Sequence, residues 1–316
     1  METRRLIAPV ELAGLRLDVA LTRLAPDLSR SRVRQLLDGG RVQVEGRAVK
    51  PAARLRGGER IELAVPAPEP VGLVAQDLPL AVLFEDHDLL VLDKAAGMVV
   101  HPARGTPHST VVNALLHRMG AAAGQAAPRL GLVHRLDRET SGCLVVAKSA
   151  AALAALQASF KARRVEKTYL ALCHGRPAAE GRLDTPYGRH PRDRKRFTAR
   201  GAGARRAVTA WRIEEGYGGA SLLEVRLHTG RTHQIRVHLS EQGHPLLGDA
   251  VYGGTRREAR LPPGHPVRRA AAALGRQALH AWRLAFPHPA TGRPISFEAP
   301  LPQDLEAALR ILRGAA

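Results

Sequence analysis

The chain of 316 residues is poor in aromatic residues, in cysteine and in acidic charge. Phe, Trp and Tyr together make up 3% of it, and Cys143 and Cys173 are its two cysteines. Two cysteines are too few for a disulfide framework, and these two lack the spacing of metal ligands. We therefore expect both to be small core residues in a reducing compartment, and the cytoplasm fits this.

Long apolar runs are also missing. Residues 1–20 alternate charged and apolar residues around Pro9, and no later segment reaches the roughly 18 to 20 apolar residues of a membrane span. We expect neither an export signal nor a membrane partner. The 45% of hydrophobic residues is ample for a packed core, and the length is typical of about two domains.

The first folded segment predicts two short helices and a hairpin. Apolar residues at helical spacing indicate a helix that Pro26 ends, and Ser29 is a suitable N-cap for a second helix that stops at Gly39-Gly40. Alternating apolar and polar residues predict strands at 41–44 and 60–65.

The chain is strongly basic, with 48 Lys and Arg against 29 Asp and Glu and a formal net charge of +19, so its natural partner is a polyanion. In the second helix, Arg30 and Arg34 share a face and Arg32 lies beside them, which suits contact with phosphate oxygens. A merely solvated basic face is the alternative. RLDVALTRL, SRSRVRQLLDGGRVQVEGRAVKP and GGERIEL resemble the S4 RNA-binding domain, which implies recognition of structured RNA by shape and backbone contacts.

We assign residues 14–65 to this domain, residues 1–13 to an N-terminal extension and residues 66–79 to a Pro-rich, stiff linker. The second domain then spans residues 80–316. Its periodicity predicts a hairpin over 82–94, helices near 110–118 and 150–164, and a strand over 166–172.

One acidic residue stands out in the segment GLVHRLDRETSGCLVVAKS, where Asp137 is bracketed by Arg135 and Arg138. Apolar runs flank a turn-rich Arg-Glu-Thr-Ser-Gly, so residues 134–137 are expected where a strand gives way to a loop. A carboxylate there can be buried, paired and directed at a ligand. From spacing alone, a structural ion pair between Asp137 and Arg135 explains the pattern equally well.

A second polar segment, SLLEVRLHTGRTHQIRVHLSEQGHPLLGD, predicts a strand through Leu227 and a helix capped by Thr232. Arg236 lies just inside that helix, where its charge suits the neutralisation of a carboxylate. His233 and His238 are on different helix faces and have no cysteine or acidic ligand nearby, so we expect no metal.

Five motifs in this order, HRLDRETSG, EKTYLAL, TGRTHQIRVHL, HPLLGDAVYGG and RQALHAWRL, resemble the RluA-type pseudouridine synthases over about residues 80–300. The resemblance implies an α+β protein whose catalytic domain has a mixed, mainly antiparallel β-sheet flanked by helices and loops. It implies that Asp137 is the catalytic aspartate, Tyr169 the active-site tyrosine and Arg236 the arginine that pairs with the aspartate. Arg135 matches the position associated with filling the gap left by a flipped nucleotide.

The implied reaction breaks the N1 to C1′ bond of a uridine in RNA, turns the uracil and rejoins it through C5, without a cofactor. Glycoside hydrolysis normally needs two carboxylates, but uracil leaves as a stabilised anion and no water is activated, so one carboxylate suffices. Asp137 would act as nucleophile at C1′ or as base at C2′, and both routes stay open. Tyr169 would stack on the base and help to remove the C5 proton. The other residues expected to bind the substrate are His134, Arg135, Leu136, His233 and Ile235.

The expected partner is large-subunit ribosomal RNA or a pre-ribosomal particle, bound by a monomer. The target uridine would be flipped out of its helix at a cost of about a few kcal/mol. Basic loops would grip the RNA, because residues 189–206 hold eight Lys or Arg and one Asp, and residues 256–269 hold five Arg and one Glu. The contacts we expect from the first loop are Arg194, Lys195 and Arg196.

Other functions fit part of this pattern. A non-catalytic S4-type protein of ribosome assembly would share the basic face but has no need of Asp137, Tyr169 and Arg236 together. A synthase of the same family that acts on another RNA would differ only in its target. A hydrolase would need a second carboxylate, a metal cluster or a Gly-x-Ser-x-Gly elbow, and none is evident in the sequence.

Overall fold

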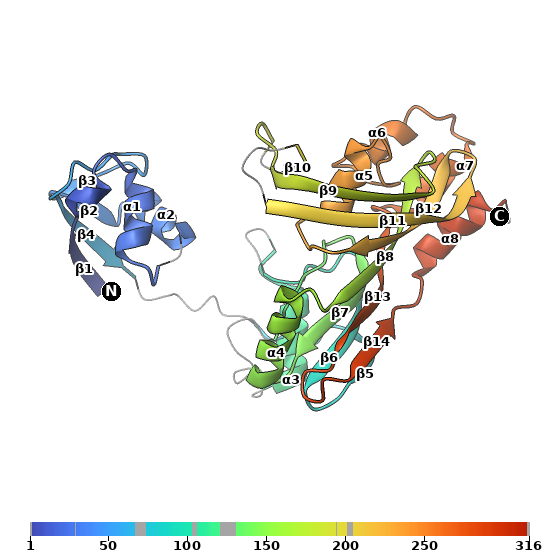
Figure 1. The fold of residues 1–316 in the computed structure, drawn as a ribbon, viewed down its shortest axis with the longest axis horizontal. Helices are drawn as coiled ribbons and strands as arrows, with labels where there is room; N and C mark the ends of the chain where they lie inside the picture. Colours follow the sequence, from blue (N-terminus) through green and yellow to red (C-terminus); the bar gives the residue numbers. More distant parts are fainter. Residues whose placement is uncertain are drawn as a thin grey trace. The chain divides into compact units, whose positions relative to one another are not determined.

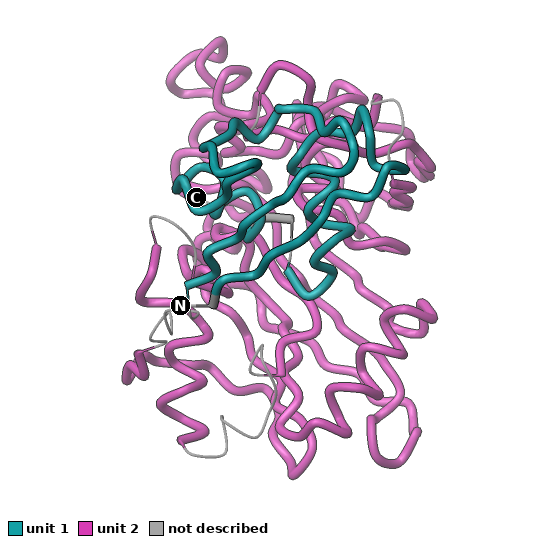
Figure 2. The backbone as a smooth tube through the Cα atoms, turned by 90° about the vertical axis from the view of Figure 1, so that its left-hand side faces the viewer, with its two compact units in different colours: residues 1–72 teal, residues 73–316 magenta. Residues whose placement is uncertain are grey.

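The structure is a computed structural model that describes residues 2–28, 30–66, 74–102, 106–120, 131–193, 195–200 and 205–314, without the side chains of residues 2, 30 and 31. The chain divides into two compact units, Met1–Gly72 and Leu73–Ala316 (Figure 2). The boundary between them falls within the segment that we expected to be a linker.

The first unit is a sheet packed against two helices. Leu17 and Leu21 of the first helix and Val33 of the second meet Ile61 and Leu63 of the sheet in one buried core. Its elements are β1 (Glu2–Ile7), the 3-10 helix η1 (Val10–Leu12), α1 (Leu17–Leu24), α2 (Arg30–Asp38), β2 (Val42–Val44), β3 (Arg47–Ala48) and β4 (Arg60–Val65).

This unit differs from the sequence prediction at its N-terminus. β1 pairs with β4 along its whole length, from Glu2 with Val65 to Ile7 with Arg60. Residues 2–7 are therefore an edge strand of the domain, and their assignment to an extension was wrong. The strands lie in the order β1-β4-β2-β3, so the expected hairpin is part of a larger sheet. Pairing between segments so far apart leaves no trace in local periodicity.

The second unit is built on one long mixed sheet, with strands in the order β10-β9-β11-β12-β8-β13-β7-β6-β5 and β14 paired to β13 (Figure 1). In the described part of the chain β13 and β7 run parallel and the other pairs are antiparallel, which confirms the predicted α+β fold with its mixed, mainly antiparallel sheet. The strands are β5 (Ala81–Glu85), β6 (Leu89–Lys94), β7 (Ser141–Ala147), β8 (Glu166–His174), β9 (Glu180–Arg189), β10 (Phe197–Thr198), β11 (Arg205–Tyr217), β12 (Ala220–Leu227), β13 (Leu279–Pro287) and β14 (Pro294–Glu298).

Helices bury both faces of this sheet. Successive residues of a strand point to opposite faces, and in β7 Leu144 and Val146 pack with α3, whereas Cys143 and Val145 pack with α4. The continuous apolar run of β7 follows from this double burial. The helices are α3 (Val111–Met119), α4 (Ala150–Lys161), α5 (Gln234–Glu241), α6 (Gly254–Glu258), α7 (Pro266–Leu274) and α8 (Gln303–Leu312).

The start of α5 differs from the prediction. Its N-cap is His233, in the left-handed region with a φ of 60°, and not Thr232. The reason lies in the turn before it, where the Gln234 side chain accepts hydrogen bonds from the Arg231 N–H and the Thr229 hydroxyl. Gln234 thus closes the turn that a threonine cap would otherwise have closed.

The C-terminal part of the expected linker belongs to the second unit. The Val74 carbonyl accepts a hydrogen bond from the Asn113 side chain at 2.7 Å, and the Gln76 N–H donates to the Asn113 carbonyl at 3.0 Å. Residues 74–76 are therefore held against α3, which corrects the boundary at residue 79. Residues 67–73 lie outside the described part of the chain.

The segment before Asp137 is a loop and not the strand that we predicted. Leu132 makes an isolated bridge with Val146, and residues 133–137 add no ladder. Leu132 is buried and Val133 is half-buried because this part of the loop packs across β7. Asp137 therefore precedes β7, and the residues that follow it on that strand fix its position from the C-terminal side.

Gly131 anchors this loop and should not tolerate a side chain. Its φ is 72°, and a Cβ would lie 1.8 Å from the Ala147 carbonyl oxygen on β7. Gly131→Ala should lower the free energy of unfolding by more than about 2 kcal/mol, measured by urea denaturation. Gly97→Ala is the matched control, because Gly97 has a φ of 86° but nothing within 4 Å of the added Cβ. Equal losses in the two variants would show that backbone strain alone, and not the contact with β7, sets the cost.

Candidate active site

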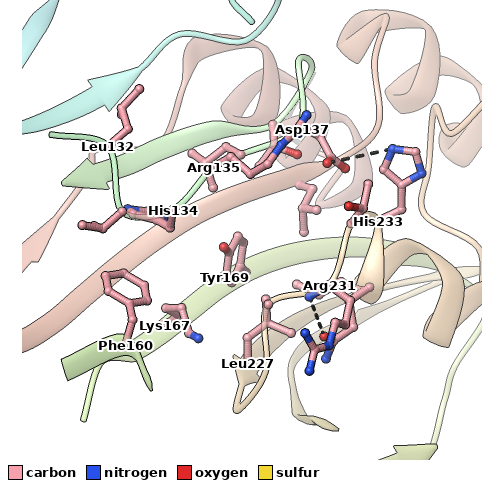
Figure 3. Close-up of a pocket in the computed structure, with 18 of the residues that line it drawn as sticks. Leu132, His134, Arg135, Asp137, Phe160, Lys167, Tyr169, Leu227, Arg231 and His233 are labelled. Carbon is pink, nitrogen blue, oxygen red and sulfur yellow. Dashed lines mark hydrogen bonds and ion pairs between the residues drawn. The ribbon is translucent and has the colours of Figure 1, made fainter. Parts of the chain in front are cut away.

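A pocket of about 710 Å³ opens in the second unit between the loop before β7 and the turn into α5 (Figure 3). The loop contributes residues 132–137, β8 contributes Lys167 and Tyr169, and the turn contributes residues 230–235. The pocket therefore gathers segments that are about a hundred residues apart, and Asp137 is the carboxylate among its lining residues.

Asp137 is held by Arg236. The Arg236 Nη1 group donates to Asp137 Oδ2 at 3.1 Å, and the Asp137 side chain keeps 17% of its surface exposed. The other edge of the same guanidinium binds Asp249 with two hydrogen bonds, of 2.7 and 3.0 Å. A bidentate pair fixes the plane of the guanidinium, so Asp249 sets the direction in which Arg236 meets Asp137.

Asp249 is fully buried, and its charge is satisfied within the protein. Besides Arg236, its Oδ1 accepts from the backbone N–H groups of Val251 and Tyr252. Burial alone would lower the pKa of Arg236, but its bonds to Asp249 and Asp137 outweigh burial and raise that pKa. The cation beside Asp137 is therefore permanent.

His233 faces the other oxygen of Asp137, with Nε2 3.9 Å from Oδ1. Its Nδ1 lies 2.9 Å from the Tyr252 hydroxyl, which also accepts from the Phe197 N–H at 3.0 Å. Among the described contacts, every group is satisfied if Tyr252 donates its one proton to Nδ1. The ring proton of neutral His233 is then on Nε2, toward Asp137. Burial lowers the pKa of His233 more than Asp137 raises it, which favours this neutral form.

Tyr169 lies in the pocket on β8, 8% exposed. Its hydroxyl has no hydrogen-bond partner among the described residues. Burial, with the charge of Asp137 as a smaller cause, raises its pKa, so the side chain stays a neutral phenol. A neutral phenol can stack on a base and donate a hydrogen bond, but it is a poor base by itself.

The other predicted pocket residues also line the pocket. Arg135 is exposed at the rim and makes no ion pair with Asp137, so the structural pairing that spacing allowed is not formed. Leu136 and Ile235 are buried in the apolar cluster beneath Tyr169. His134 Nε2 accepts from the Val145 N–H at 3.1 Å, and burial lowers its pKa to about 3, so it is a neutral wall residue tied to β7.

Several of the side chains predicted to contact RNA already have partners within the protein. Arg34 pairs with Asp38 one helical turn away, and Arg32 donates to the Pro66 carbonyl. Lys195 is exposed, whereas Arg196 is half-buried with its guanidinium 5.3 Å from the centroid of the Tyr252 ring. The Arg30 side chain and Arg194 lie outside the described part of the structure.

Sequence reasoning missed three residues at this site. Asp249 and Tyr252 lie in the motif HPLLGDAVYGG, which carried the family resemblance but no assigned role. Lys94 is 2% exposed, and its ammonium donates to the carbonyls of Ala95, Met98 and Arg138. Lys94 thereby ties its own loop to the residue after Asp137, and burial lowers its pKa to about 8.

One cluster outside the pocket has the composition of a metal site. Asp86, Asp88 and His288 bring their ligand atoms within 4.8 Å of one another. Asp86 already accepts from the N–H groups of Asp88 and Leu89 and contacts the His288 ring at 2.8 Å, so the cluster closes the turn between β5 and β6. None of the helices that the structure describes is both long and apolar enough to span a membrane.

Known proteins are similar to this chain in sequence. The family model for RNA pseudouridylate synthase matches residues 88–241, and that for the S4 domain matches residues 15–61. The ribosomal large subunit pseudouridine synthase D of Xanthomonas campestris pv. campestris is 44% identical, covering 98% of this chain and 92% of that protein. The protein of the same name from Vibrio parahaemolyticus is also 44% identical, covering 95% of this chain and 91% of that protein.

Two solved structures of human proteins are also similar to this chain. Human RNA pseudouridylate synthase domain containing 4 has a TM-score of 0.57 at 27% identity and covers 74% of this chain and 93% of that chain. Human RNA pseudouridylate synthase domain containing 1 has a TM-score of 0.56 at 27% identity and covers 74% and 89%. The chain therefore belongs to the RNA pseudouridine synthase family and carries an S4 domain ahead of its catalytic domain.

Proposed function

We propose that this protein converts specific uridines of large-subunit ribosomal RNA to pseudouridine, with Asp137 as its catalytic carboxylate and without a cofactor. The observation that carries the proposal is the placement of Asp137 in the pocket, held by the buried pair Arg236 and Asp249 and facing Tyr169. The close relatives in bacteria are named for large-subunit ribosomal RNA, which supports this target.

The reaction needs one carboxylate. The N1 to C1′ bond breaks, the uracil turns within the pocket, a C5 to C1′ bond forms, and the C5 proton is lost while N1 gains one. Asp137 either attacks C1′ and forms a glycosyl ester or removes the C2′ proton, and in both routes its carboxylate is regenerated. Arg236 holds the carboxylate in line with the ribose.

Tyr169 keeps the detached base in place. Its neutral ring stacks on the uracil, and its hydroxyl donates to a base oxygen. Its raised pKa disfavours the phenolate that direct removal of the C5 proton would require. The C5 proton therefore leaves through a second acceptor, for which Asp137 is available in either route once its carboxylate has been regenerated.

Exclusion of water decides between isomerisation and hydrolysis. Leu136, Leu227, Ile235 and Leu279 form an apolar floor beside Asp137. A hydrolase of the inverting or retaining type uses a second carboxylate, and the described lining of this pocket offers Asp137 alone. The apolar floor lets the uracil anion recombine with C1′ before water reaches it.

RNA is the partner of both units. We propose that the first unit binds structured ribosomal RNA through the basic face of α2, and that the loop around Lys195 contacts phosphates near the pocket. The protein acts as a monomer in the cytoplasm, on free large-subunit RNA or on a pre-ribosomal particle. The target uridine is flipped into the pocket, and Arg135 at the rim fills the space that it leaves in the RNA.

The proposal is tested by tritium release from C5-labelled uridine in large-subunit RNA, followed by nucleoside analysis of the product. We expect tritium release to be matched by pseudouridine, with no free uracil. Free uracil and abasic sites would identify a hydrolase instead. Binding without release from any RNA of the large subunit would favour an assembly role, and release from another RNA would correct the target.

A further inference from the structure

The pocket has a second end that the proposed chemistry leaves unused. Figure 3 shows Tyr169 near the middle of the pocket, with Asp137 and His233 toward one side and Lys167 and Phe160 toward the other. Lys167 precedes Tyr169 by two residues on β8, so both side chains point to the same face of the sheet. An ammonium group is thus built into the wall of the pocket next to the base-binding ring.

The charge of Lys167 is half-buried and uncompensated. Its Nζ lies 5.9 Å from the centroid of the Phe160 ring. Within the part of the chain that the structure describes, no carboxylate forms an ion pair with it. Burial lowers its pKa, and the charge of Arg163 lowers that pKa further.

The groups around Lys167 add no negative charge. His134 stacks on Phe160 with ring centroids 5.1 Å apart and is neutral, since burial lowers its pKa to about 3. The pKa of His228 is lowered by burial and then by surrounding cations that include Arg182 and Lys167. The neighbouring Glu166 is exposed and, by strand alternation, points to the opposite face. This end of the pocket therefore carries a positive potential.

A half-buried cation without a partner is costly, and a ligand that brings an anion removes the cost. We propose that Lys167 binds a backbone phosphate of the RNA strand that carries the target uridine. The inference rests on the proposed function and adds to it a binding site for one phosphodiester group.

The position of Lys167 along β8 favours contact with a backbone phosphate rather than with the flipped base. Residues 161–164 and Glu166 are exposed, whereas residues 168–174 are buried, so Lys167 stands where the strand passes from solvent to the interior. A flipped base and its ribose enter the pocket, but the backbone on either side must stay at the mouth. A flexible point charge is well suited to a phosphate held there.

The test compares Lys167→Met with Lys161→Met, which removes an equal charge from the exposed end of α4. In tritium-release assays Lys167→Met should raise KM for RNA by about ten- to a hundredfold with little change in kcat. In binding titrations on an Asp137→Asn background, the slope of log affinity against log salt should fall by about 0.7. Lys167→Arg should restore most of the affinity and the slope, and Lys161→Met should leave KM within about twofold.

Stability separates binding from a structural role. Because Lys167 lacks a partner, Lys167→Met should leave the urea midpoint unchanged or raise it, whereas a structural lysine would lower it. A fall in kcat with unchanged KM and salt slope would place Lys167 on the leaving uracil and overturn the proposal, as would no effect at all. If the wild-type protein releases no tritium but the salt slope still falls in Lys167→Met, the proposed function fails while the phosphate site stands.

Discussion

Asp137→Asn should lower the rate of pseudouridine formation by about a thousandfold or more, since an amide can neither attack C1′ nor accept the C2′ proton. The fold should survive, because Arg236 keeps its two bonds to Asp249. RNA affinity should also survive. The measurement is single-turnover tritium release, with RNA binding and urea denaturation run on the same preparation.

Glu139→Gln is the control for that substitution. Glu139 follows Asp137 by two residues in the same loop but does not line the pocket. Because its half-buried side chain does not line the pocket, its neutralisation should change the rate by less than about threefold. Activity that survives in Asp137→Asn, or an equal loss in Glu139→Gln, would remove Asp137 from the chemistry.

Arg236→Met should destabilise the protein by about 3–5 kcal/mol in addition to abolishing activity. The substitution leaves Asp249, which is fully buried, with a charge that two backbone N–H groups alone must satisfy. Urea denaturation followed by circular dichroism measures the loss. A change below about 1 kcal/mol would mean that Asp249 takes up a proton or reaches water, contrary to its described burial.

The double variant Arg236→Met with Asp249→Asn separates stability from catalysis. An asparagine oxygen can still accept from the Val251 and Tyr252 N–H groups, and the fully buried charge of Asp249 is gone, so that only the partly exposed Asp137 loses its partner. Most of the stability should return, while activity stays absent because nothing holds Asp137. Recovery of activity along with stability would show that Arg236 serves the fold and not the carboxylate.

The sequence predicted helices and their ends well where these depend on residues close together in the chain. The helices expected near 110–118 and 150–164 are α3 and α4, and the structure shows that Thr110 and Ser149 cap them. Leu24 ends α1 two residues before Pro26. These features depend on neighbours within a few residues, which the sequence displays directly.

Tertiary contacts were predicted poorly from residue patterns alone. Residues 2–7, Glu-Thr-Arg-Arg-Leu-Ile, lack the alternation of apolar and polar residues that marks a strand, and their partner β4 is more than fifty residues away in the chain. Leu132 and Val133 are apolar because their loop packs across β7, and periodicity cannot separate such a loop from a strand. In the same way, the meeting of Asp137 with Arg236 was inferred from the family resemblance and not from any spacing.

The roles of neutral polar residues were the hardest to predict. His134 is a wall residue bonded to β7, whereas Tyr252, which carried no assigned role, connects three parts of the site. A hydrogen bond between side chains depends on distances of a few tenths of an ångström, which no composition or motif records.

Tyr252 also joins the pocket that holds Asp137 to the strand that borders the basic loop. Its hydroxyl is shared between the Phe197 N–H on β10 and His233, and Arg196 and Arg236 both lie within 5.3 Å of its ring centroid. Couplings between two sites are reciprocal. If RNA bound at the loop shifts β10 and thereby strengthens uridine binding in the pocket, uridine in the pocket must strengthen RNA binding at the loop by the same free energy.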